Sequence, residues 1–473
     1  MRTGTLDDTG DAFPGGGLVP RWERVQAAAA RLQPQAGDGD GDSVEEILRW
    51  LSERREAGGF RVDRIAFDEL DGWGFREDTG DLAHRSGRFF TVQGLHVTGD
   101  TTVPREWYQP IINQPEVGIL GILTKEFEGV PHFLMQAKME PGNPNMVQLS
   151  PTVQATRSNY TGAHGGRKVR YLDYFVEPGR ARVLADVLQS EHGSWFYRKN
   201  NRNMLVEVAA DSVVPEHEDF RWIGLGQLAR LLRHDNTVNM DARTVLACAP
   251  TADPDPYALR TDTDLLSWFT GERSRHQITS ETVPLASIPD WTRSADRISH
   301  DRGQYFDVVA VAVEAGAREV ASWSQPLIRP HGPGVTAFIT KRFGGVPHLL
   351  VHARVEGGFL DTVELGPTVQ CTPENHAHLP SEDRPAFLEL VRSAAPEHIR
   401  YEAVHSEEGG RFLEAESRYL VVDADDGRLA SDPPPGYCWA TPGQLNALLR
   451  HGNYVNVQAR TLLACINTGA VRL

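Results

Sequence analysis

Cysteine is scarce in this chain, with four residues among 473 and no C-x-x-C pair. So few cysteines argue against a disulfide-stapled scaffold and against a structural zinc site, and a reducing cytoplasm is the compartment we expect. Long apolar runs are also missing, because runs such as 308–313 are far shorter than the roughly 18 to 20 residues that span a bilayer. The first twenty residues lack the basic start and apolar core of a secretory signal. We therefore expect a cytoplasmic protein that does not enter membranes.

Excess positive charge is absent as well. The 48 Lys and Arg residues against 64 Asp and Glu residues give a formal net charge of −16 at pH 7. Such a field repels nucleic acid and anionic lipid, so any phosphate ligand has to be held by a local basic site. A hydrophobic content of 40% and a charged content of 24% are typical of a folded globular protein and exclude a wholly disordered chain.

Several common catalytic motifs are missing too. No G-x-G-x-x-G opens a helix after a strand, and G-x-x-x-x-G-K-[ST], G-x-S-x-G and H-E-x-x-H do not occur. These absences exclude nicotinamide, P-loop, α/β-hydrolase and zinc-protease chemistry. No paired acidic cluster has metal-ligand spacing, so we predict no metal and no cofactor.

What the sequence does contain is an internal repeat. TKEFEGVPHFLMQAKMEPG, from Thr124, matches TKRFGGVPHLLVHARVEGG, from Thr340, and the same shift of 216 positions joins WYQPII at Trp107 to WSQPLI at Trp323. A period this long indicates two whole domains, since solenoid units repeat every 20 to 50 residues. We expect two homologous domains arranged as a pseudo-twofold pair. The predicted division is a disordered tail (1–42), a first repeat (43–249), a linker (250–262) and a second repeat (263–473).

Within each repeat, alternation of apolar and polar residues comes first and helical spacing follows. Residues 132–140 and 148–156 alternate with period two around turn residues and predict a hairpin of two strands. Leucines at helical spacing predict a helix over 224–234, and a second helix is predicted over 238–248. Each repeat is therefore predicted to be α+β, with a mixed, mostly antiparallel sheet and flanking helices.

The polar face of the predicted hairpin is the first candidate site. It carries neutral Gln, Ser and Thr side chains, which suit sugar hydroxyls better than the charged residues typical of a protein surface. The same types recur in the second copy at Thr368, Gln370 and Thr372. The alternative is the ordinary solvent face of an antiparallel sheet. Likewise, Arg243 lies in a polar helical stripe that fits a helix contact or a dimer contact as well as a phosphate clamp.

Four longer segments carry a specific resemblance: WYQPIINQPEVGILG, LMQAKMEPGN, LSPTVQATRSNYT and TVNMDARTVLAC. With their second copies, they resemble the NDP-hexose 2,3-dehydratases of antibiotic deoxysugar pathways. The resemblance covers almost the whole chain except the N-terminal tail. It implies two Nudix-like domains in each subunit, a homodimer, and a dTDP-4-keto-6-deoxyhexose substrate. The acidic Nudix box R-E-x-x-E-x-x-E-E-x-G is missing, so a Nudix-like shape does not imply Nudix hydrolysis.

The implied reaction can proceed without a cofactor. The C4 ketone acidifies the C3 proton, and its removal gives an enolate that expels the C2 hydroxyl. The protein must supply a base, donors for the enolate oxygen and an acid for the leaving hydroxyl. The product is a dTDP-3,4-diketo-2,6-dideoxyhexose, which a separate 3-ketoreductase would trap. The alternatives are a non-catalytic nucleotide-sugar-binding protein and an atypical Nudix-type diphosphate hydrolase.

We predict Lys138, Glu140 and Tyr160 as the proton-transfer group, although Lys138 and Glu140 could equally be a structural ion pair of little energetic weight. The first copy is predicted to hold the chemistry because the second changes Gln148 to Glu364 and Arg157 to Pro373, which adds a carboxylate and removes a cation. The predicted substrate contacts are Trp107, Gln109, Gln136, Gln148, Thr152, Gln154, Thr156, Arg157, Asn159, Arg202 and Arg243.

Overall fold

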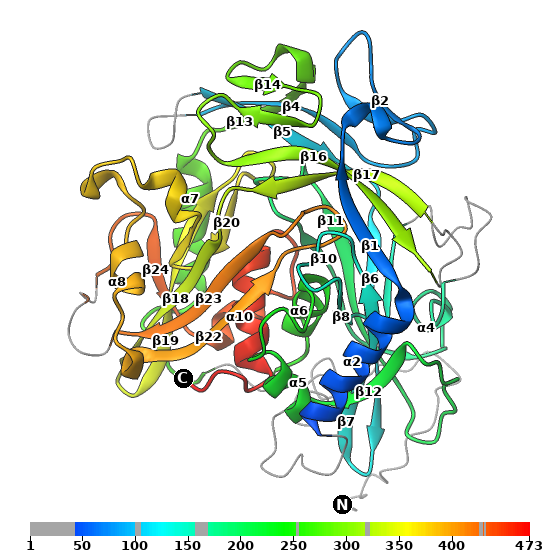
Figure 1. The fold of residues 1–473 in the computed structure, drawn as a ribbon. Helices are drawn as coiled ribbons and strands as arrows, with labels where there is room; N and C mark the ends of the chain where they lie inside the picture. The colour runs from blue at the N-terminus through cyan, green and yellow to red at the C-terminus, as the bar shows by residue number, and fades with distance from the viewer. Residues whose placement is uncertain are drawn as a thin grey trace, which may run out of the picture.

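The computed structural model describes residues 43–99, 106–156, 169–251, 255–316, 322–424, 429 and 432–473. The predicted disordered tail and the candidates Arg157, Asn159 and Tyr160 lie outside these ranges. Two repeats of the same architecture lie side by side, the first in blue to green and the second in green to red (Figure 1). No helix in the described part of the chain is long and apolar enough to span a membrane.

The main sheet of the first repeat has seven strands in the order β10-β11-β6-β7-β12, with β8 paired to β7 and β9 paired to β6. Strands β6 and β11 are parallel, and the other neighbours are antiparallel. The strands are β6 (Gly118–Phe127), β7 (Val130–Met139), β8 (Val147–Ser150), β9 (Val153–Ala155), β10 (Arg182–Ser190), β11 (Asn200–Val208) and β12 (Phe220–Gly224).

The second repeat builds the same sheet in the order β22-β23-β18-β19-β24, with β20 paired to β19 and β21 paired to β18. Again one pair, β18 and β23, is parallel. The predicted α+β class with two tandem repeats is thereby confirmed. The strands are β18 (Gly334–Phe343), β19 (Val346–Val355), β20 (Val363–Gly366), β21 (Val369–Cys371), β22 (Ile399–Ser406), β23 (Glu416–Asp423) and β24 (Tyr437–Ala440).

The predicted second strand of the hairpin, 148–156, is broken in two. Its first part, β8, pairs with β7, whereas its second part, β9, pairs with β6 on the other side. Pro151 at the break has no N–H to donate. The Thr152 hydroxyl bonds to both neighbouring strands instead. It accepts from the Leu123 N–H of β6 at 2.9 Å and donates to the Leu134 carbonyl of β7. The prediction of one continuous strand was therefore wrong, and the proline with its threonine explains why.

The two repeats exchange strands. A smaller sheet in each repeat takes its outer strand from the other, because β1 pairs with β16 and β13 pairs with β4. In Figure 1 the blue strand β1 runs beside β16 of the second repeat. The strands are β1 (Phe60–Ile65), β2 (Trp73–Phe75), β3 (Leu82–His84), β4 (Thr91–Thr98), β5 (Glu106–Asn113), β13 (Thr279–Val283), β14 (Trp291–Arg293), β15 (Arg297–His300), β16 (Phe306–Ala315) and β17 (Ser322–Pro330).

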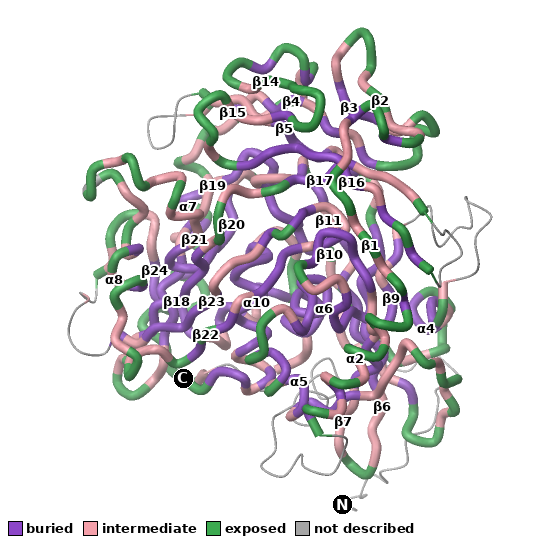
Figure 2. The backbone as a smooth tube through the Cα atoms, in the orientation of Figure 1, coloured by how far each residue is buried: buried purple, intermediate pink, exposed green. Residues whose placement is uncertain are grey.

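Helices α6 (Met240–Ala247) and α10 (Val457–Asn467) pack against each other at the centre of the molecule, where the backbone is buried (Figure 2). Together with α5, α6 accounts for the two predicted helices. The remaining helices are α2 (Val44–Gly58), α4 (Asp173–Val176), α5 (Leu225–Leu231), α7 (Asp262–Arg275), α8 (Leu388–Arg392) and α9 (Pro442–Leu448), with short 3-10 turns at Phe67–Glu69, Leu285–Ser287, Pro373–His376, Ser381–Asp383 and Pro396–His398.

Reciprocal hydrogen bonds across this helix pair show the pseudo-twofold relation. Arg243 Nε donates to Thr461 Oγ1 at 3.3 Å, and its copy Arg460 Nε donates to Thr244 Oγ1 at 2.7 Å. Both guanidinium groups are fully buried and also donate to backbone carbonyls of the opposite repeat. A buried cation needs such partners. In this structure Arg243 therefore makes a contact between the repeats.

Candidate functional site

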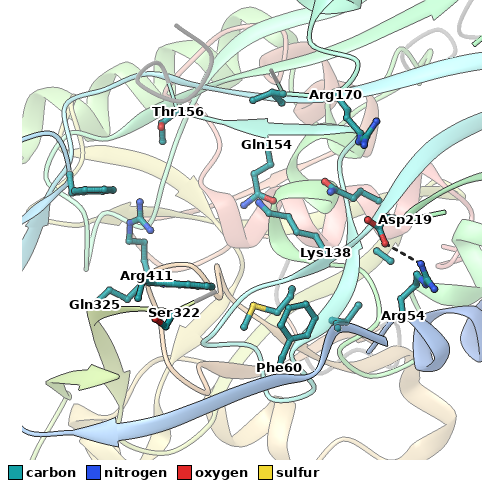
Figure 3. A pocket seen from close by; sticks show the side chains of 18 of the residues that line it. Arg54, Phe60, Lys138, Gln154, Thr156, Arg170, Asp219, Ser322, Gln325 and Arg411 are labelled. Atoms are coloured by element: carbon teal, nitrogen blue, oxygen red, sulfur yellow. Dashed lines mark hydrogen bonds and ion pairs between the residues drawn. The ribbon is translucent and has the colours of Figure 1, made fainter. Parts of the chain in front are cut away.

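A cavity of about 1140 Å³ lies between the two repeats. The polar side of β7 and β9 in the first repeat lines this space, and residues of β17 and of the segment after β22 in the second repeat line it as well. In Figure 3, Lys138 and Gln154 face the space from one side, while Gln325 and Arg411 face it from another. The volume is ample for a ligand of nucleotide-sugar size.

Five of the predicted site residues meet in the lining of this cavity: Gln136, Lys138, Thr152, Gln154 and Thr156. They come together because positions two apart on a strand share a face. The Gln154 side chain is held in place by a hydrogen bond, since its Oε1 accepts from Ser150 Oγ at 2.8 Å. The amides of Gln136 and Gln154 in this lining offer donors and acceptors of the kind that sugar hydroxyls use.

Lys138 and Glu140 form an ion pair at the wall of the cavity. The Lys138 Nζ lies 3.6 Å from Glu140 Oε1, and the two side chains are 20% and 4% exposed. The same Oε1 accepts from Gln154 Nε2 at 2.7 Å. Asn143 Nδ2 donates to the other oxygen, Oε2, at 3.4 Å. Because Glu140 is buried and held by three partners, the pair differs from the exposed pairs that contribute little.

Gln148, by contrast, lies outside this lining. It is fully buried, and its Nε2 donates to Ser406 Oγ of the second repeat at 2.8 Å. Its copy Glu364 lies in the equivalent place and accepts from Ser190 Oγ at 2.6 Å. Burial raises the pKa of Glu364 to about 7. The change from Gln148 to Glu364 thus alters the contact between the repeats.

The W-x-Q motif of the second repeat lines the cavity together with residues of the first repeat. Trp323 and Gln325 line the cavity beside Lys138, whereas Trp107 and Gln109 lie elsewhere. Gln325 Nε2 donates to the Gly410 carbonyl at 2.8 Å, and in the other copy Gln109 Nε2 donates to the Ser194 carbonyl at 2.6 Å. Each motif therefore supports a loop of its own repeat. The internal repeat in the sequence revealed the W-x-Q motif, but it did not show which of the two sites each copy of the motif lines.

Arg202 also lies away from the cavity lining. It forms a surface ion pair with Asp186 at 2.6 Å, and its copy Arg418 pairs with Glu402 in the same way. The recurrence of this arginine in both repeats is thus accounted for by a cross-strand pair on an outer strand. Such pairs are worth at most about 1 kcal/mol.

Arg411 is a cavity residue that the sequence reasoning missed. Its Nε donates to Gln114 Oε1 at 3.1 Å, and its guanidinium lies over the Phe90 ring at 4.6 Å. The shift of 216 positions pairs Arg411 with Trp195, within HGSWF and EGGRF, so the cation belongs to one copy alone. A comparison of the two copies in this segment would have found it.

The equivalent position in the second repeat cannot do the same chemistry. Arg354 replaces Lys138, and its Nε lies 2.6 Å from Glu356 Oε1. Its Nη1 donates to the Gln370 carbonyl at 2.9 Å. A guanidinium does not lose its proton in proteins, so Arg354 cannot serve as a base. Nearby, burial lowers the pKa of His352 to about 3.

Behind the first-repeat cavity the structure places further carboxyl groups. Burial raises the pKa of Asp241 well above its usual range, and the carboxylates of Glu408 and Glu140 add to that shift. Among the residues the structure describes, no group of three or more His, Cys, Asp or Glu side chains is arranged to hold a metal ion.

Comparison with known proteins gives a consistent result. The family model described as NDP-hexose 2,3-dehydratase matches residues 44–249 and 262–466. A dTDP-4-dehydro-6-deoxy-alpha-D-glucopyranose 2,3-dehydratase of Amycolatopsis orientalis is 58% identical over 459 residues, which cover 96% of each chain. Proteins with the same description are 49% identical in Saccharopolyspora spinosa, covering 89% of this chain and 91% of the relative, and 51% identical in Streptomyces violaceoruber, covering 89% and 96%.

Proposed function

The chain belongs to the NDP-hexose 2,3-dehydratase family, and we propose that it eliminates water from a dTDP-4-keto-6-deoxyhexose. The C3 proton and the C2 hydroxyl leave, and the product is a dTDP-3,4-diketo-2,6-dideoxyhexose. The observation that carries this proposal is the Lys138–Glu140 pair at the wall of a cavity whose mixed lining includes the amides of Gln136 and Gln154. The substrate's own ketone is the electron sink, so the dehydration step itself requires no cofactor.

Lys138, Glu140 and Tyr160 form the proton-transfer group in this proposal. Lys138 lines the cavity, and Glu140 lies directly behind it, so a proton taken at C3 can be shared within the pair. Tyr160 follows β9 in the sequence and supplies a hydroxyl donor. Proton removal at C3 and protonation of the leaving hydroxyl then both occur beside β7 and β9, where donors also stabilise the enolate oxygen.

Arg411 holds the diphosphate in the same proposal. The protein carries a net charge of −16, so a dianionic group must bind where a cation offsets that field. Arg411 lines the cavity from the second repeat, and a guanidinium can make paired hydrogen bonds to phosphate oxygens (Figure 3). This places the sugar between Arg411 and Lys138.

The finer assignments extend the family resemblance. Each repeat is a Nudix-like domain, the enzyme is a cytoplasmic homodimer, and it serves an antibiotic deoxysugar pathway in which a 3-ketoreductase consumes the product. The mixed sheet with flanking helices supports the domain assignment. Light scattering of the purified protein tests the dimer, because a mass near 52.4 kDa would contradict it.

The elimination is tested with dTDP-4-keto-6-deoxyglucose as the probe. In deuterated buffer, with enzyme and no reductase, we expect mass spectrometry to show deuterium at C3 or loss of water. A coupled 3-ketoreductase then traps the diketone, with and without a chelator. Elimination that survives the chelator supports the proposal. Metal-dependent release of dTMP would indicate a diphosphate hydrolase, and binding without any change in the sugar would indicate a non-catalytic binding protein.

A further inference from the structure

The segment after β22 in the second repeat reaches the back of the first-repeat site. It is fastened there by the backbone, since the Gly142 N–H donates to the Gly409 carbonyl at 2.7 Å and the Glu414 N–H donates to the Gly142 carbonyl at 2.8 Å. Gly142 comes two residues after Glu140, so these bonds fix the position of Glu408 relative to Glu140. The second repeat thereby places a carboxyl group behind the predicted proton-transfer pair.

Glu408 and Glu140 face the same small gap. A Cβ atom built on Gly410 would lie 3.4 Å from Glu408 Oε1 and 3.9 Å from Glu140 Oε1. The backbone at Gly410 therefore passes close to both carboxyl groups. Two carboxyl groups so close cannot both carry a full charge without mutual repulsion.

The charged and titratable neighbours of Glu408 come from every element around it. Burial raises the pKa of Glu408 to about 7, and the Arg411 guanidinium partly opposes that shift. These neighbours are Lys138 on β7, Glu140 after β7, Glu191 after β10, Lys199 before β11, Asp241 on α6, and Glu407 and Arg411 on its own segment. The carboxyl groups outnumber the cations, so the ionisation of Glu408 depends on the charges of these neighbours.

Two members of this cluster have unsatisfied oxygen atoms. Asp241 Oδ1 and Glu191 Oε2 are buried, at 2% exposure for each residue, and have no hydrogen-bond partner among the described residues. Buried carboxylate oxygens without partners are costly. The interior behind the cavity is thus arranged so that an added proton is held more readily than a further negative charge.

This arrangement belongs to one copy. At the position that matches Glu408 the first repeat has His192, whose Nε2 lies 2.9 Å from Glu407 Oε2. At the position that matches Asp241 the second repeat has Gln458. The second site therefore lacks both of these carboxyl groups, although the surrounding backbone repeats. The same repeat also has Arg354 at the position that matches Lys138.

We propose that Glu408, contributed by the second repeat, is a positioning residue that supports elimination only while it holds its proton. The inference rests on the function proposed above. Ionised Glu408 would put a second negative charge beside Glu140, close to where the enolate and the diphosphate carry theirs. Protonated Glu408 leaves the Lys138–Glu140 pair free to exchange a proton with the substrate. The turnover number should therefore fall when Glu408 ionises.

The test measures kcat between pH 6 and pH 9 for the wild type and for two variants. In the wild type we expect kcat to fall above about pH 7, by as much as about tenfold per pH unit. Glu408→Gln keeps the neutral form at every pH, so its kcat should vary less than about threefold over the same range. Glu364→Gln is the matched control, because it removes another buried carboxyl with a pKa raised to about 7, outside the cavity lining, and should keep the wild-type profile.

The alternatives give different results. If Glu408→Gln lowers kcat equally at every pH, or keeps the alkaline decline, the residue has only a structural role and the inference is wrong. If that variant does not fold, Glu408→Asp decides, since a shorter carboxyl group should move the midpoint of the decline, and an unmoved midpoint would overturn the inference. A wild type without elimination at any pH would refute the proposed function and this inference with it.

Discussion

Replacing Glu364 by Gln should stabilise the protein at alkaline pH relative to the wild type. Glu364 is fully buried between the repeats, and its Oε2 accepts from Ser190 Oγ at 2.6 Å. Burial is the main reason why its pKa is raised to about 7 from 4.5, while the hydrogen bond and Arg460 act in the opposite direction. Gln148 occupies the equivalent place in the first repeat, so an amide fits this environment.

The sign follows from proton binding in the two states. Between pH 4.5 and pH 7 the folded protein keeps the Glu364 proton, whereas the unfolded chain releases it. The contribution of this group to stability is therefore complete at acid pH and is lost as the pH rises through about 7. At about 1.36 kcal/mol for each pH unit, the loss amounts to about 3 kcal/mol. Glutamine does not titrate and has no such loss.

Urea unfolding of the wild type and Glu364→Gln at several pH values between 5 and 9 measures this difference. The variant's free energy of unfolding minus that of the wild type should rise by about 2 to 3 kcal/mol over the range. Gln148→Glu is the reciprocal control, and its stability relative to the wild type should decline over the same range. Parallel curves for the wild type and Glu364→Gln would refute the reasoning, because Glu364 would then titrate alike in both states.

The remaining predictions compare matched positions in the two repeats. Lys138→Met should lower C3 exchange and elimination by at least about 100-fold, whereas Arg354→Met at the copied position should change both by less than about threefold; equal losses would contradict the assignment of chemistry to the first repeat. Gln325→Ala should lower kcat/KM by about tenfold, whereas Gln109→Ala should leave it unchanged. Each variant loses a hydrogen bond to a loop carbonyl and one from the tryptophan of its own motif, so the two should lower Tm to a similar extent. The reverse order of kcat/KM values would place the site in the second repeat. Gly142→Ala should lower the free energy of unfolding by at least about 2 kcal/mol in urea, because its Cβ would lie 1.8 Å from the Phe412 carbonyl oxygen; a smaller change would mean that the two segments separate easily.

The sequence by itself determined the duplication and the class of each repeat. The duplication is visible as matching segments 216 positions apart, and the strand over 132–140 is visible as alternation of apolar and polar residues. Both features correspond to β7 and its copy β19 in the structure. The clustering of Gln136, Lys138 and Gln154 could also be predicted from the sequence, because residues two apart on a strand point to the same face. Local pattern failed at Pro151, where the chain changes its pairing partner within a few residues.

Only the tertiary structure decided which repeat completes which site. Strand exchange and the segment after β22 bring Gln325 and Arg411 to the cavity that Lys138 lines and Glu408 close to Glu140, while Trp107 lies near Gly357 of the second repeat. Because the two copies share the same motifs, the sequence shows what each half contains but not which of the two sites a motif lines. That choice depends on pairing between residues more than 200 positions apart, as in the contact of β1 with β16, and on the packing of α6 against α10.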